Sequence, residues 1–201
     1  MLFGGFMPTF LLILLVAFGC CLSSVLHELG HCTIARKCHL RICEFRIGVL
    51  GAATAIEGEP EFAWQAAALA GIGPLINAVL AVILLAGEFT LTLMSVRNGA
   101  LYAVLWSGIW FNCIMTIANL LPVLPLDGGF VLRSLCWAHT DSKIRASHLA
   151  LRAGWGFIAL AGLSTIAMLS LRQQTAAMIT GMVLLFTIYV ELLYAKYRPA
   201  V

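Results

Sequence analysis

Two histidines and one glutamate interrupt an otherwise uncharged, apolar stretch near the N-terminus. Residues 7–35 contain no Lys, Arg or Asp, yet His27, Glu28 and His31 lie among them in the sequence HELGH. Residues four apart share one face of a helix, so His27 and His31 can hold one zinc ion. Glu28 can then act as general base on a water molecule. Because ionisable groups in hydrocarbon are costly, the cluster predicts a hydrolytic zinc site.

The predicted third ligand is Asp127, since a hydrolytic zinc usually takes three protein ligands and keeps one position open. Asp127 lies in NLLPVLPLDGG, at 119–129. Pro122 and Pro125 are expected to break the preceding helix, and Gly128–Gly129 to allow a tight turn after Asp127. Irregular backbone at membrane depth is tolerated where protein buries it or where it lines a water-filled cavity, which suits a metal site. The alternative is a solvated Asp in an interfacial loop.

The elements that must position these residues are transmembrane helices. The chain is 62% hydrophobic and 10% charged, which excludes a soluble domain. Runs of about 20 apolar residues can cross a bilayer. Five such runs are predicted, at 8–35, 64–87, 100–121, 153–171 and 175–195. They use up nearly all of the 201 residues, so we expect one membrane domain with no soluble module and no nucleic-acid partner.

Basic residues fall almost entirely on one side of these five spans. One side receives Arg36, Lys37, Arg41, Arg46, Arg133, Lys143, Arg145, Arg152, Lys196 and Arg198, and the other receives Arg97 and Arg172. Cytoplasmic loops carry an excess of Lys and Arg. The asymmetry of ten to two therefore predicts an N-terminus outside and a C-terminus in the cytosol. The plasma (inner) membrane is the expected location of this multi-pass protein.

The segment between the first two spans is not helical in pattern. Residues 43–62 (CEFRIGVLGAATAIEGEPEF) have no helical period and are too polar and glycine-rich to cross the bilayer. Arg46, Gly48, Gly51 and Thr54 lie among Ile, Val and Leu residues, which indicates short strands in a re-entrant hairpin. An exposed strand edge there can pair with an extended substrate. The alternative is a plain surface hairpin. The expected fold class is an all-α polytopic membrane protein with this short β region.

Three motifs together resemble the site-2 protease family of intramembrane zinc metalloproteases. They are HELGH in the first span, GIGPLIN at 71–77 and NLLPVLPLDGG after the third span, and the resemblance covers residues 8–135. It implies zinc ligands at His27, His31 and Asp127, and a catalytic glutamate at Glu28. It also implies that Asn119 helps to orient the substrate or the oxyanion.

Two further asparagines are candidates for substrate binding. Asn112 lies seven residues before Asn119 on the same helical face, and Asn77 ends the GIGPLIN motif. The alternative for both is hydrogen bonding between helices. GIGPLIN departs from the commoner Ala-Gly-Pro of the family, because two residues, Ile72 and Gly73, stand between Gly71 and Pro74. There is also no room for the PDZ or CBS domains common in the family, so we expect a minimal form with a catalytic core at 1–135. A cytosolic loop and two helices would follow at 136–201.

The resulting hypothesis is a zinc metalloendopeptidase that hydrolyses peptide bonds in or beside transmembrane segments, as in regulated intramembrane proteolysis. Its partners would be a transmembrane protein substrate and the lipid bilayer, and a homo-oligomer is left open. A metal transporter would explain buried His and Asp, but not Glu28 beside the first ligand. An inactive scaffold of the same fold is disfavoured by the intact HExxH and Asp127.

Overall fold

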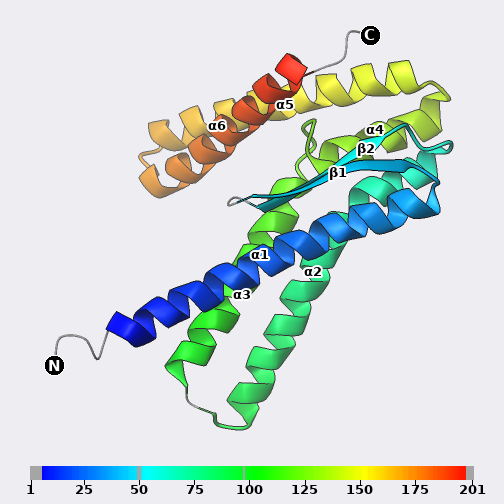
Figure 1. Cartoon of the computed structure of the whole chain (residues 1–201). Helices are drawn as coiled ribbons and strands as arrows, with labels where there is room; N and C mark the ends of the chain where they lie inside the picture. The colour runs from blue at the N-terminus through cyan, green and yellow to red at the C-terminus, as the bar shows by residue number, and fades with distance from the viewer. Residues whose placement is uncertain (1–5, 49–50, 97, 198–201) are drawn as a thin grey trace. The chain divides into compact units, whose positions relative to one another are not determined.

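A computed structural model describes residues 6–48, 51–96 and 98–197 of the chain. Figure 1 shows its elements in chain order. They are α1 (Phe6–Lys37), β1 (Arg41–Gly48), β2 (Gly51–Glu57), α2 (Ala63–Leu93), α3 (Gly99–Asn119), α4 (Asp127–Thr140), α5 (Lys143–Ser170) and α6 (Gln174–Tyr197). Arg97 and Arg198, which entered the charge comparison, lie outside the described residues.

The prediction of five membrane-crossing helices is confirmed. In the described part of the chain, α1, α2, α3, α5 and α6 are long and apolar enough to span a bilayer. Much of the segment 122–152, predicted as a loop between the third and fourth spans, is helical: α4 runs from Asp127 to Thr140 and α5 begins at Lys143. The side chain of Ser142 caps α5 by accepting a hydrogen bond from the Arg145 amide. A capped helix can begin before its apolar part. Hydropathy alone therefore predicted the start of α5 too late, at residue 153 instead of Lys143.

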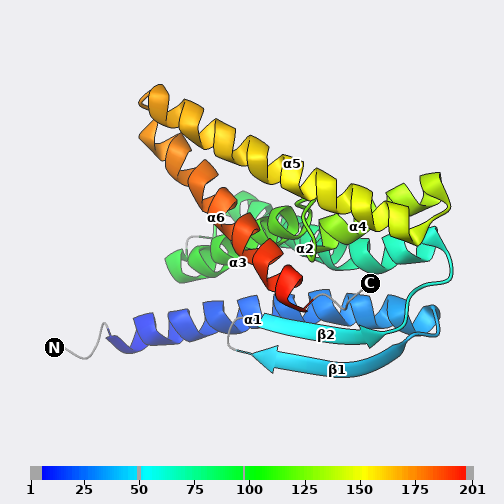
Figure 2. The same ribbon diagram turned by 90° about the horizontal axis from the view of Figure 1, so that it is seen from above.

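The predicted strands form an antiparallel hairpin of two strands. Its register pairs Arg41 with Glu57 and Gly48 with Gly51, with an irregularity between Ile42 and Glu44. The hairpin runs alongside α1, as Figure 2 shows. The backbone therefore confirms a β region between the first two spans.

The described residues group into two compact units. The first comprises Met1–Pro60 and Ile72–Ala118, and the second comprises Glu61–Gly71 and Asn119–Val201. The predicted division at residue 135 coincides with neither unit, and it stays a prediction about the extent of the catalytic core.

Small residues set the helix contacts of the first unit. A Cβ atom on Gly30 of α1 would collide with Cδ1 of Ile76 and would come within 3.3 Å of Ile72 on α2. A Cβ atom on Gly108 of α3 would stand 2.9 Å from Leu84 of α2. Glycine at both positions thus allows close packing of α2 against its two neighbours, as is usual between membrane helices.

In the second unit, the loop at 120–126 lies directly on the first turn of α4. A Cβ atom on Gly129 would come within 2.6 Å of the Val123 and Leu124 backbone, and one on Gly128 would collide with the Leu120 carbonyl. Gly128–Gly129 were expected to form a tight turn after Asp127. They instead belong to α4, where their missing side chains admit the loop backbone.

Candidate metal centre

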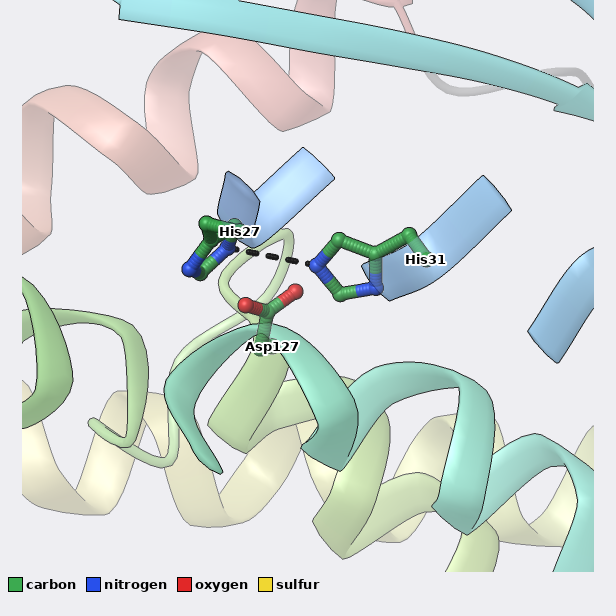
Figure 3. Close-up of side chains that lie close together, drawn as sticks. All are labelled: His27, His31 and Asp127. Atoms are coloured by element: carbon green, nitrogen blue, oxygen red, sulfur yellow. Dashed lines mark hydrogen bonds between the residues drawn. The ribbon is translucent and has the colours of Figure 1, made fainter. Parts of the chain in front are cut away.

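The two histidines of HELGH lie on one face of α1, with one ring nitrogen of each converging. His27 is 4% exposed and His31 is 8% exposed. Their Nε2 atoms are 3.2 Å apart, the separation drawn as a dashed line in Figure 3. Two nitrogens on one tetrahedral zinc ion stand about 3.3 Å apart, given Zn–N distances of about 2.0–2.1 Å. The pair is therefore spaced to share one metal ion.

Gly73 of α2 keeps the space beside these nitrogens open. A Cβ atom at this position would stand 2.5 Å from Nε2 of His27 and 2.5 Å from Nε2 of His31. Real Cβ atoms essentially never come this close to another heavy atom, so any larger residue would displace the rings. The absence of a side chain at Gly73 leaves room for an atom bound to both nitrogens.

The other ring nitrogen of His27 is engaged by a buried chain of amides. Nδ1 of His27 makes a short hydrogen bond with Oδ1 of Asn77. Nδ2 of Asn77 donates to Oδ1 of Asn112 over 2.8 Å, and Nδ2 of Asn112 donates to Oγ of Ser23 over 3.1 Å. Asn77 and Asn112 are both 0% exposed. Because their amides bond to protein groups, these contacts fit the interhelical alternative better than contact with a substrate.

Asp127 begins α4, in its first turn. One possible ligand atom from each of His27, His31 and Asp127 lies within 4.8 Å of the others, and Figure 3 shows the three side chains together. Two imidazole nitrogens and one carboxylate oxygen are a donor set that zinc accepts.

The remaining predicted residues are half-buried. Glu28 follows His27 on α1, and Asn119 is the last residue of α3. Partial exposure is compatible with contact to a water molecule or a substrate.

Gly73 lies beside the ring nitrogens of His27 and His31, a place that the sequence motifs did not predict for it. Helical spacing could have found it, because Gly73 precedes Asn77 by four residues. It thus shares a helix face with a recognised candidate.

Comparisons with known proteins give a consistent result. The profile of peptidase family M50 matches residues 13–97 and 90–163. Rip3 of Mycobacterium tuberculosis, described as a zinc metalloprotease, is 32% identical over 66% of this chain and 33% of its own length. A protein of Synechocystis with the same description is 33% identical over 67% of this chain and 35% of its own length. The chain thus spans about a third of the length of these curated relatives.

A solved structure has a similar fold. The site-2 protease from Methanocaldococcus jannaschii superposes with a TM-score of 0.54 and 19% sequence identity, over 90% of this chain and 77% of that one. At this level of identity the similarity concerns the fold. It agrees with the membrane architecture predicted from the sequence.

Proposed function

Since the chain belongs to peptidase family M50, we propose that it is a zinc metalloendopeptidase of the HExxH type. Its substrates are membrane proteins, cut in or beside their transmembrane segments. The observation that carries the proposal is the pair of buried Nε2 atoms of His27 and His31, 3.2 Å apart beside Gly73. Polar side chains buried on an apolar membrane helix require a specific reason, and a shared metal ion supplies it.

The ligand set proposed for zinc is His27, His31 and Asp127. Three protein ligands leave one position open, which is the arrangement of hydrolytic rather than structural zinc sites. The proximity of the three ligand atoms and the room beside Gly73 support this set. When bound, zinc supplies Lewis-acid polarisation of a carbonyl group and makes water a stronger acid.

The chain's own residues then have distinct roles. The carboxylate of Glu28 takes a proton from the attacking water and passes it to the leaving amine. Asn119, at the end of α3, offers an amide that can hydrogen-bond the substrate backbone or the developing oxyanion. Apolar helices around the site limit the access of bulk water, so that these polar interactions gain strength.

The proposal is tested by zinc content and by cleavage of a reporter that carries a transmembrane helix. Purified protein should hold about one zinc per chain. Loss of an outer-sphere partner typically weakens metal binding by about 10–100-fold. Asp127→Ala should weaken zinc binding by more than this, because it removes a direct ligand. Cleavage should fall in parallel. Zinc content is measured by elemental analysis and affinity by chelator competition.

The matched control is Asp141→Ala. Asp141 follows α4 and is exposed, so its loss should leave zinc and cleavage unchanged. Full zinc retention in Asp127→Ala would remove this residue from the ligand set. Wild-type protein that binds no zinc, or that does not cut the reporter, would overturn the proposed function itself.

We also propose that the N-terminus faces outside and the C-terminus the cytosol, on the basis of the charge asymmetry. The loops at 36–63 and 122–152 would then be cytosolic. A cysteine introduced at Asn98 should react with a membrane-impermeant maleimide only from the outer side, and one at Ser142 only from the cytosolic side. The background is a variant whose seven native cysteines are replaced. The reverse labelling pattern would refute the orientation.

A further inference from the structure

A backbone carbonyl in α3 fixes the orientation of the buried amide chain. Nδ2 of Asn112 donates to the carbonyl oxygen of Gly108 over 2.8 Å. A carbonyl oxygen only accepts hydrogen bonds, so the atom of Asn112 that faces it must be the NH₂ group. Oδ1 of Asn112 is therefore the atom directed at Asn77.

The orientation of the Asn112 amide fixes the orientation of Asn77 and, through it, the proton on His27. Because Oδ1 of Asn112 is an acceptor, the Asn77 atom that faces it over 2.8 Å is Nδ2, a donor. This leaves Oδ1 of Asn77 facing Nδ1 of His27. An amide oxygen only accepts, so the proton of this hydrogen bond belongs to Nδ1. A neutral imidazole with its proton on Nδ1 carries its lone pair on Nε2, the atom that converges with His31.

We infer that Asn77 and Asn112 are positioning residues that hold His27 in the Nδ1–H tautomer, with the Nε2 lone pair directed at the metal. The inference rests on the proposed function, since it assumes a metal on Nε2. It gives the two asparagines a role other than substrate binding. Outer-sphere partners of this kind fix the tautomer and ring orientation of a ligand, and their loss typically costs 10–100-fold in metal affinity.

Burial makes this orientation hard to reverse. Asn77 and Asn112 are fully buried, and their bonds connect α1, α2 and α3 within one compact unit. Flipping either amide would place oxygen against oxygen or nitrogen against nitrogen in a region of low dielectric, where an unmatched polar group is costly. A purely structural bond between helices would not need to end on a ligand nitrogen with a defined proton.

The first test is the tautomer of His27 in zinc-free protein, measured by NMR with ¹⁵N-labelled histidine. The chain has five histidines, so assignment by single substitutions is practicable. We expect the Nδ1–H form in the wild type. In Asn112→Ala the Asn77 amide becomes free to turn, so a mixture of tautomers is expected. The Nε2–H form in the wild type would overturn the inference without any variant.

The second test is the zinc affinity of Asn77 variants, measured by competition with a chromophoric chelator. Asn77→Leu removes the acceptor and should weaken zinc binding by about 10–100-fold. Asn77→Asp keeps an oxygen acceptor toward Nδ1, and its second oxygen can donate to Oδ1 of Asn112 when the buried carboxyl is protonated. Zinc affinity should therefore stay within about threefold of wild type, a smaller change than the loss of an outer-sphere partner.

Ser23→Ala is the matched control. Ser23 also accepts a hydrogen bond from Asn112, but the Gly108 carbonyl still fixes the orientation of the Asn112 amide when the Ser23 hydroxyl is lost. The zinc affinity and the His27 tautomer should therefore not change.

Thermal unfolding of zinc-free samples shows which variants are folded. If wild type binds zinc and cuts the reporter, but Asn77→Leu binds zinc equally well when folded, the inference fails while the proposed function stands. If Asn77→Leu does not fold, equal loss of affinity in Asn77→Asp and Asn112→Ala refutes it.

Discussion

Replacing Glu28 by glutamine should lower the rate of peptide hydrolysis by about 10²–10⁴-fold, the usual contribution of a general acid–base group. Zinc content should remain at the wild-type level, because Glu28 lies beside His27 in sequence but is not among the proposed ligands. Glutamine has nearly the same shape, yet it cannot accept a proton at neutral pH. The measurement is single-turnover cleavage of the transmembrane reporter, with zinc determined on the same preparation.

Glu88→Gln is the matched control for this variant. Glu88 is also a half-buried glutamate on a membrane-spanning helix, α2, where Thr92 donates a hydrogen bond to it. Its substitution should leave the cleavage rate unchanged. A metal transporter would behave differently, since it should keep its function in Glu28→Gln. Undiminished hydrolysis by Glu28→Gln with normal zinc content would exclude Glu28 as the base.

Much of the fold could be predicted because the thickness of a bilayer fixes how many consecutive apolar residues a membrane-spanning helix needs. The five spans and the non-helical segment after the first of them follow from runs of apolar residues and their interruption. Helix ends were less predictable. Ser142 caps α5 well before its apolar part begins, and α4 is too short and too polar to give a membrane signal.

The candidate site was predictable where one helix carries the pattern, and unpredictable where helices meet. His27 and His31 are four residues apart on α1, so their convergence follows from helix geometry alone. The contact between Asn77 and Asn112 joins residues 35 positions apart, and no spacing rule relates them. The Gly73 backbone beside the histidine rings is likewise a product of how closely α2 packs on α1. Such contacts depend on the helix packing that small residues allow.

Gly73→Ala should reduce zinc affinity by at least about 100-fold, the upper end of the loss seen for outer-sphere changes, and should abolish cleavage. The added methyl group would stand 2.5 Å from the Nε2 atoms of both histidines, so the rings must move. His27 cannot turn away cheaply, because its Nδ1 is bonded to buried Asn77. The measurement is chelator competition together with reporter cleavage.

Helix propensity alone does not predict this loss of zinc affinity. Alanine favours a helix interior over glycine by about 0.8–1.0 kcal/mol, so backbone propensity alone would make Gly73→Ala neutral or stabilising. Gly87→Ala lies on the same helix, α2, with no atom within 4 Å of the added methyl group, and it should retain zinc and activity. A folded Gly73→Ala protein that binds zinc as tightly as Gly87→Ala would show that the space beside His27 and His31 is not used by a metal ion. Selective loss of zinc from Gly73→Ala alone would locate the ion next to the α2 backbone.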